Sequence, residues 1–111
     1  MKDRTHLSTF ELMVMLALAR LGEQAYGVPI AAEIARQSGR DVLIGSVYAS
    51  LERLQKKGYA ASALGDPTPE RGGRAKKYFR LTAKGVREAR DAQRTLTRLW
   101  RGFPRLKGQH A

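Results

Sequence analysis

The sequence contains no cysteine among its 111 residues. Without thiols the chain can form neither a disulfide framework nor a thiolate metal site. Its longest apolar run, Leu12–Ala19, is too short to span a bilayer, and the segment from Met1 to His6 lacks the apolar core of a signal peptide. We therefore expect a single small cytoplasmic domain that is stabilised by its hydrophobic core alone.

Acidic residues are scarce in the last third of the chain. Residues 1–70 carry eight Lys or Arg and eight Asp or Glu, whereas residues 71–111 carry thirteen basic residues and two acidic ones. The whole net charge of +11 therefore lies in that last third. Such a charge attracts polyanions, nucleic acid first and anionic membranes second, and the alternative is that the excess arginine only keeps the protein soluble.

Side chains that perform catalysis or bind metals are also scarce. The two histidines, His6 and His110, stand alone near the ends, and the acidic residues are scattered singly. The sequence has no spacing typical of a Ser-His-Asp triad, a metal site or a phosphate-binding loop. We therefore expect no enzymatic activity, no metal and no cofactor.

Three helical patterns fill the first half of the chain. Ser8 and Glu11 have the spacing of a capping box ahead of an apolar stretch that ends at Gly22, which predicts the first helix. A second helix is predicted over 27–38 and a third over 45–57. Because apolar residues surround nearly the whole first helix, we expect more than one of its faces to be covered, in part by a second subunit.

The hydrophobic period changes after the third helix. A short strand is predicted over 59–64 and a loop over 65–73. Residues 76–81 alternate between apolar and polar, which predicts a second strand and hence a hairpin with a long basic tip. Thr82 can then cap a fourth helix that runs to about residue 101.

Three helices followed by a two-stranded hairpin and one more helix is the order of a winged helix-turn-helix, a mainly α fold with a small β-hairpin (α+β). The segments AYGVPIAAEI, SVYASLERLQKKGY and GGRAKKYFRLTAKG resemble the matching segments of the PadR-like transcriptional regulators, in the same order and spacing. The single helix after the wing resembles the compact branch of that family. We divide the chain into a winged-helix DNA-binding domain over 1–81, a dimerisation helix over 82–103 and a disordered tail over 104–111.

The expected DNA contacts form two groups. One side of the third helix carries small residues followed by basic ones, which suits a helix that enters the major groove, and the wing tip is basic and rich in glycine. In the family both elements touch DNA, and the resemblance implies the same here. The predicted DNA-binding residues are Ser46, Tyr48, Ala49, Arg53 and Lys56 on the helix, and Arg71, Arg74, Lys76 and Lys77 on the wing. Core packing is the alternative role for Tyr48, and a solvated turn is the alternative for the wing.

The fourth predicted helix is sharply divided into an apolar face and an arginine face. The apolar residues around Leu96 have no place in a core that the first three helices already fill, so we interpret them as a dimer seam. PadR-like proteins dimerise through this helix and the first one. The expected interface residues are Phe10, Met13, Ala89, Ala92, Leu96, Leu99, Trp100 and Phe103. The opposite face carries Arg87, Arg94, Arg98, Arg101 and Arg105, which we interpret as solvated surface, with a second DNA contact or a membrane contact as the alternative.

The resulting functional hypothesis is a sequence-specific regulator, a repressor, that binds a pseudo-palindromic operator in double-stranded DNA as a homodimer at the bacterial nucleoid, with no membrane partner. Some PadR-like proteins bind planar aromatic effectors between their subunits, so the resemblance implies a small aromatic effector that contacts Phe10 or Trp100 and releases the DNA. A core position is an equal alternative for Trp100. The alternative function is a winged-helix protein-interaction module or antirepressor without sequence-specific DNA binding.

Overall fold

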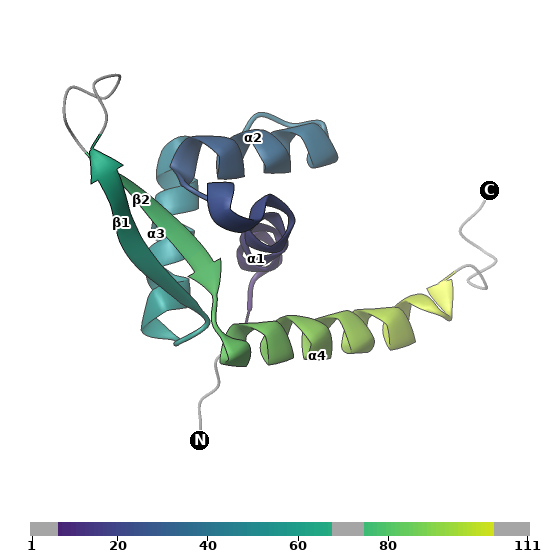
Figure 1. The fold of residues 1–111 in the computed structure, drawn as a ribbon. Helices are drawn as coiled ribbons and strands as arrows, with labels where there is room; N and C mark the ends of the chain where they lie inside the picture. Colours follow the sequence, from purple (N-terminus) through teal and green to yellow (C-terminus); the bar gives the residue numbers. More distant parts are fainter. Residues whose placement is uncertain (1–6, 68–74, 104–111) are drawn as a thin grey trace.

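The computed structural model of the chain describes residues 7–67 and 75–103. In chain order they form α1 (Thr9–Leu21), the 3₁₀ turn η1 (Gly22–Gln24), α2 (Gly27–Ser38), α3 (Ile44–Lys56), the strands β1 (Ala60–Pro67) and β2 (Ala75–Leu81), and α4 (Ala83–Trp100) (Figure 1). The strands pair antiparallel in a two-stranded sheet. The predicted fold class, mainly helical with one hairpin, is therefore confirmed. The predicted tail over 104–111 lies outside the described residues.

The predicted caps of the first and last helices are present. The Ser8 hydroxyl accepts a hydrogen bond from the backbone N–H of Glu11, and the Glu11 carboxylate accepts one from the backbone N–H of Ser8, so the capping box of α1 is complete. The Thr82 hydroxyl accepts a hydrogen bond from the Gly85 N–H at the start of α4. Each cap satisfies backbone donors that a helix start leaves without an internal partner. None of the helices in the described ranges is long and apolar enough to cross a bilayer.

The hairpin is longer than the sequence predicted. β1 continues three residues past the predicted end at Leu64, because β2 begins at Ala75 and provides a partner as far as Pro67. The register shifts between Leu64 and Pro67. An irregular register of this kind accommodates glycine and proline in a strand. The predicted loop over 65–73 is therefore wrong for residues 65–67.

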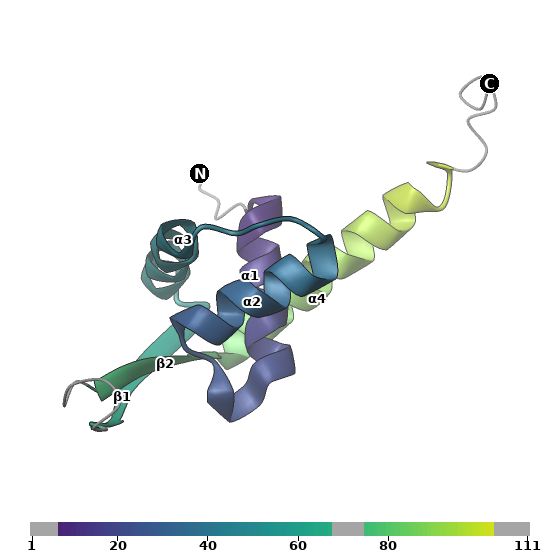
Figure 2. The same ribbon diagram turned by 90° about the horizontal axis from the view of Figure 1, so that it is seen from above.

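α1 is the central element of the core. It packs against α2, α3, β2 and α4, while the hairpin closes one side of the three-helix unit (Figures 1 and 2). The buried apolar side chains come from every part of this arrangement before α4: Val14, Met15, Ala17, Leu18, Ala25, Ile30, Ile34, Val47, Leu51, Leu54, Tyr59, Ala60 and Phe79. The three-four spacing of the helical members places them on the inward faces of their helices.

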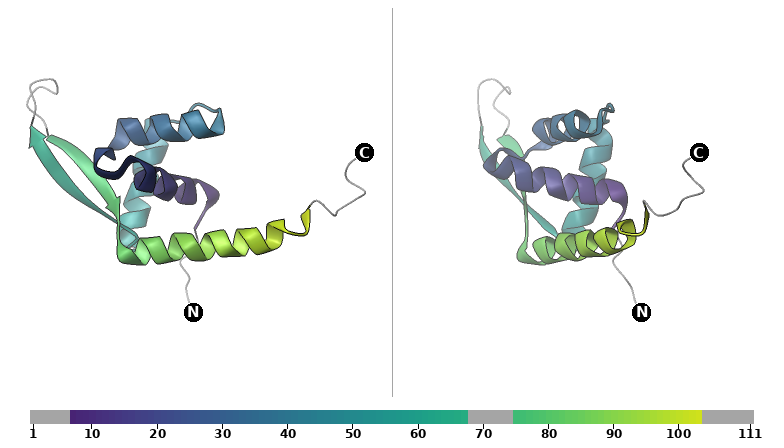
Figure 3. Two further views of the ribbon diagram at one scale, coloured as in Figure 1. Left: turned by 45° about the vertical axis from the view of Figure 1, so that its right-hand side comes forward. Right: turned by 90° about the vertical axis from the view of Figure 1, so that its right-hand side faces the viewer.

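α4 is attached to the core mainly through its first half. A Cβ at Gly85 would overlap the backbone carbonyl of Tyr59, so this close approach requires glycine. The Thr82 N–H donates to the Tyr59 carbonyl oxygen at 3.0 Å, and Ala89 packs against the core one turn later. Beyond that point the helix extends past the other helices (Figures 2 and 3). The hairpin and α4 thus meet at residues 81–83, and the far end of the strands and the C-terminal end of α4 point in different directions (Figure 1).

Candidate nucleic-acid interface

α3 buries one face and exposes the other. Val47, Ser50, Leu51 and Leu54 are buried against the core. The five predicted DNA-binding residues of this helix, Ser46, Tyr48, Ala49, Arg53 and Lys56, are all exposed. The structure therefore brings them together on the outer surface of α3, where a nucleic acid can reach them.

Tyr48 also packs against the N-terminus of α2. A Cβ at Gly27 would overlap the ring and hydroxyl of Tyr48, so glycine at this position lets the ring lie over the first turn of α2. Tyr48 nevertheless keeps 45% of its surface exposed. Packing therefore occupies one side of the tyrosine and leaves the rest accessible to a ligand.

A cluster of three residues joins the wing to the same end of α2. Tyr26, the N-cap residue of α2, forms an edge-to-face pair with Tyr78 of β2, with ring centroids 5.4 Å apart. The Lys76 ammonium lies 4.5 Å from the centroid of the Tyr26 ring and 3.4 Å from its hydroxyl oxygen. The Phe79 N–H donates to the Ala25 carbonyl oxygen at 2.8 Å and fixes β2 at this level. The Tyr26 cluster, defined as Tyr26, Lys76 and Tyr78, therefore holds a cation of the wing next to the first turn of α2.

Tyr26 is not among the DNA-binding residues predicted from the sequence. Its only signal was its place in the segment AYGVPI, immediately before the glycine that begins α2. The first turn of α2 carries the positive end of the helix dipole, which favours an anion. Gly27 is buried against Tyr48 and Pro29 has no N–H, so the exposed Val28 is the residue of this turn that can offer a backbone donor. Tyr26, Lys76 and this helix start together form a surface that suits a phosphate group.

Of the other predicted wing residues, the structure describes Lys77 alone. Lys77 is exposed, and its ammonium lies 5.7 Å from the centroid of the Phe79 ring. Arg71 and Arg74 lie outside the described residues. The strand ends at Pro67 and Ala75 that flank them are at the end of the hairpin farthest from α4 (Figure 1).

A buried carboxylate of α1 holds Arg53. Arg53 Nε donates to Glu11 Oε2 at 2.8 Å and its Nη2 donates to Ser50 Oγ at 3.0 Å, while Lys57 Nζ donates to Glu11 Oε1 at 3.0 Å. Burial raises the pKa of the Glu11 carboxyl, but hydrogen bonds from the Ser8 N–H, Arg53 and Lys57 outweigh burial and lower the pKa to about 2. Glu11 is therefore ionised at neutral pH.

The Glu11 ion pair changes the expectation for Arg53. Two of the five N–H donors of the guanidinium are used within the chain, which leaves three for a nucleic acid. Half of the Arg53 side chain, 52%, is exposed. Arg53 is thus a positioned cation whose approach to DNA is limited by its contact with α1.

The apolar face of α4 is uncovered in the single chain. Leu96, Leu99, Trp100 and Phe103 are each more than half exposed, and the Trp100 and Phe103 rings stack with centroids 4.9 Å apart. The alternative of a core position for Trp100 is therefore wrong for the chain alone. The other predicted interface residues lie deeper: Phe10, Met13 and Ala89 pack against the core, and Ala92 is half-buried.

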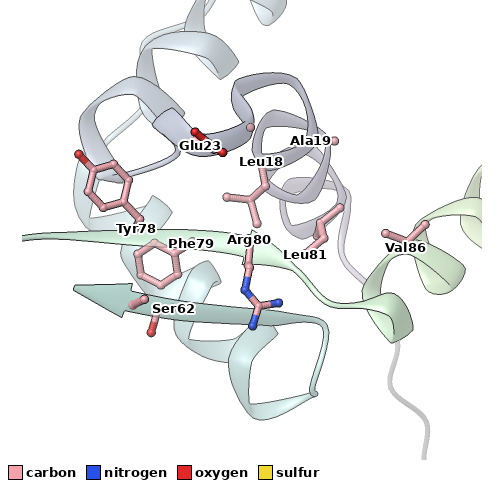
Figure 4. A pocket seen from close by; sticks show the side chains of 11 residues that line it. Leu18, Ala19, Glu23, Ser62, Tyr78, Phe79, Arg80, Leu81 and Val86 are labelled. Carbon is pink, nitrogen blue, oxygen red and sulfur yellow. The ribbon is translucent and has the colours of Figure 1, made fainter. Parts of the chain in front are cut away.

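Two apolar hollows lie beside α4, one next to its apolar face and one at its start. One of about 350 Å³ lies between α1 and α4 and includes Leu12, Leu16 and Leu96. The other, of about 530 Å³, lies between the end of α1, the hairpin and the start of α4, with Leu18 and Phe79 among its buried side chains (Figure 4). The first hollow extends the apolar face of α4 onto α1, whereas the second lies apart from Leu96 and the residues beyond it.

The two predicted effector contacts are not brought together. Phe10 lines a hollow with Val42 and Ser46, whereas Trp100 lines another with Leu96 and Phe103. Within one chain, a single small ligand in either hollow therefore contacts only one of the two aromatic residues.

The geometry defines the class of protein. Three helices, a two-stranded wing and a long helix after the wing make a winged helix-turn-helix, and residues 15–91 match the model of the transcriptional regulator PadR-like family. This match covers more than half of the sequence. The chain belongs to the PadR-like family of transcriptional regulators, which act by binding DNA.

Solved structures of similar fold come from several bacteria. A PadR family transcriptional regulator from Eggerthella lenta DSM 2243 is 28% identical, with a TM-score of 0.71 over 88% of this chain and 83% of that chain. A PadR-like transcriptional regulator from Bacillus cereus is 21% identical, with a TM-score of 0.72 over 87% and 89% of the two chains. A PadR family regulator from Clostridium difficile R20291 is 18% identical, with a TM-score of 0.71 over 88% and 97%. The last two support the fold alone. Among curated proteins, none matches this sequence.

The lowered pKa of Glu11 predicts a pH-dependent contribution to stability. Because the pKa in the folded protein, about 2, is below the ordinary value of 4.5, the contribution is complete above pH 4.5 and is lost as the pH falls towards 2. Glu11→Gln should lower the free energy of unfolding at pH 7 by at most about 3 kcal/mol, and by much less near pH 2, where the carboxyl is protonated. Urea unfolding at both pH values measures this difference.

Glu23→Gln is the matched control, because Glu23 is exposed and makes no hydrogen bond or ion pair within the described part of the chain. The control variant should unfold like the parent protein at both pH values. An equal loss of stability at pH 7 and at the acid end in Glu11→Gln would contradict the charge-based account.

Proposed function

We propose that this protein is a transcriptional repressor that binds a pseudo-palindromic operator in double-stranded DNA as a homodimer, in the cytoplasm at the nucleoid. The observation that carries the proposal is the Tyr26 cluster, since it couples the basic wing to the α2 helix start beside the exposed face of α3. A phosphate bound there would fix the register of the protein on DNA, so that α3 enters the major groove.

Each predicted residue has a distinct task in this arrangement. Ser46 and Ala49 are small and exposed, so the N-terminal half of α3 can approach the base edges closely. Lys56 and the free donors of Arg53 lie further along the helix, where they suit phosphate or base contacts. Lys76 and Lys77, with Arg71 and Arg74 at the tip, would bind the backbone beside the groove, and Tyr48 would add its hydroxyl.

Dimerisation would supply a second recognition helix for the other half of the operator. An exposed helix end that carries Leu96, Leu99, Trp100 and Phe103 is the kind of apolar surface that marks a protein interface. We place the two-fold seam on this end of α4 and on the hollow beside α1. The less exposed residues of the predicted interface, Phe10, Met13, Ala89 and Ala92, would pack beneath it. Such a dimer would present two recognition helices about 34 Å apart, one helical turn of DNA.

A ligand at the seam is a natural means of release. A planar aromatic effector that stacks on Trp100 would change the packing of the two α4 helices and hence the spacing of the recognition helices. The contact with Phe10 belongs to a different hollow, beside Ser46 at the start of α3. Of the two predicted effector residues, Trp100 is therefore the better supported.

The predicted phosphate contact of the wing is tested with two lysines that make the same kind of contact at different places. Lys76 and Lys84 each lie over a tyrosine ring, Tyr26 and Tyr59 respectively, but Lys84 is on α4 at the other end of the hairpin. Lys76→Ala should weaken binding to all duplexes alike and reduce the salt slope by about 1, because one phosphate contact is lost. Titrations of labelled DNA at several salt concentrations measure both quantities.

Lys84→Ala should leave both the affinity and the salt slope unchanged. An unchanged slope for Lys76→Ala would contradict a phosphate contact by the wing. Equal losses in the two variants would mean that only the overall charge matters.

The dimer seam predicts the effect of a charge at its centre. Leu96→Glu should convert the dimer to a monomer, because a buried carboxylate without a partner is costly at an apolar interface. Sedimentation velocity measures the mass in solution. Thr95→Glu is the control, since residue 95 lies off the apolar face of the same helix and is exposed. A dimer that survives Leu96→Glu unaltered would place the seam elsewhere.

A further inference from the structure

The arginine face of α4 has no task in the operator complex proposed above. We define it by the exposed residues of the described chain that share this side of the helix: Arg87, Arg94, Arg98 and Arg101. α4 contacts the core through Ala89, and at 100° per residue Arg87, Arg94 and Arg98 lie on the opposite side of the helix. This side faces away from α1, whereas α2 and the far end of the hairpin lie beyond α1 (Figure 1).

Most of these arginines form no ion pair with the residues that the structure describes. Arg94 pairs with Asp91 at 3.3 Å, and Arg98 donates to the Thr95 hydroxyl at 3.5 Å. The guanidinium groups of Arg87 and Arg101 make no hydrogen bond or ion pair within 7–67 and 75–103.

Arginines of the three-helix core are bound differently. Arg20 and Arg36 both pair with the buried carboxylate of Glu33. Arg53 pairs with Glu11, which is also buried. The core thus satisfies these cations with carboxylates, whereas the arginine face presents cations to an external anion.

The spacing along α4 suits a polyanion. The face runs over fourteen residue steps, or roughly 21 Å, along one straight helix. A DNA duplex carries one phosphate charge per about 1.7 Å of its axis, so a row of this length meets several phosphates at once. Arginine binds phosphate with two parallel hydrogen bonds, which strengthens each contact.

We propose that the arginine face of α4 binds a second DNA duplex, so that the protein bridges its operator to another DNA segment. The proposal rests on the proposed operator binding, because the winged helix holds the first duplex on the other side of the molecule. A bilayer is a poorer fit, since a helix that binds in the membrane plane inserts its apolar face, and that face of α4 lies on the side of α1 and in the proposed dimer seam.

The experiment measures capture of a second duplex. Operator DNA is immobilised and saturated with the full chain, and a fluorescent non-operator duplex is then added at several salt concentrations. The parent protein should capture it. The variant R87Q/R94Q/R98Q should hold the immobilised operator with unchanged affinity but bind the second duplex about tenfold more weakly or worse, with a salt slope shallower by about 3.

The matched control keeps the charge. R87K/R94K/R98K should retain most of the capture, because lysine also binds phosphate and both replacements are good helix formers, as arginine is. Unchanged operator binding by both triple variants shows that they are folded.

Light scattering of the parent complex should show dimers, and capture that occurs only in larger aggregates would overturn the proposal.

Three other results would also overturn it. The first is a parent complex that captures no second duplex, and the second is capture by R87Q/R94Q/R98Q equal to that of the parent. The third is binding of the parent complex to phosphatidylglycerol vesicles in place of DNA, lost in R87Q/R94Q/R98Q, which would assign the face to a membrane. Failure of operator recognition itself is seen separately, as equal retention of the parent protein on immobilised operator and on scrambled DNA.

Discussion

The hydrogen bond from the Phe79 N–H to the Ala25 carbonyl oxygen joins the hairpin to the three-helix core, and the candidate DNA-binding surface depends on it. Phe79 is buried on one side of β2, and Tyr78, its neighbour, meets Tyr26 on the other. The wing is therefore anchored at the turn that precedes α2. Lys76 lies two residues before Tyr78 on the same strand, so its charge occupies a defined place next to the start of α2. A flexible basic loop would carry the same charge but would not hold it at a fixed position.

The distribution of carboxylates explains which of the cations behind the net charge of +11 are accessible to an external anion. Glu11 and Glu33 are buried in the three-helix core, and each binds two cations. The wing and α4 have few acidic residues of their own, so most of their cations face outwards. The far end of the wing and the C-terminal end of α4 lie well apart, although the two elements meet at residues 81–83 (Figure 1). One end serves the proposed operator contact, and the other is the basis for the proposed second duplex.

The sequence predicted the features that depend on local chemistry. Ser8 and Glu11 indicated the start of α1, Thr82 indicated the start of α4, and the apolar stripe around Leu96 indicated a surface that the core does not cover. It did not predict contacts between distant positions. Lys76 and Tyr26 are 50 residues apart and Arg53 and Glu11 are 42 apart, and no local pattern marks such pairs. The extension of β1 was missed because glycine and proline at 65–67 are typical of loops, and pairing with β2 overrides that preference.

The central claim is that the exposed face of α3 and the anchored wing read a DNA sequence. The most direct measurement compares the affinity of the parent protein for its own promoter with that for a scrambled duplex of equal length and composition, at near-physiological salt. The account predicts that the promoter binds about a thousandfold more tightly or better, with one protected, two-fold related site in a footprint. Equal affinities for the two duplexes would contradict it and would favour a winged-helix module that binds a protein partner.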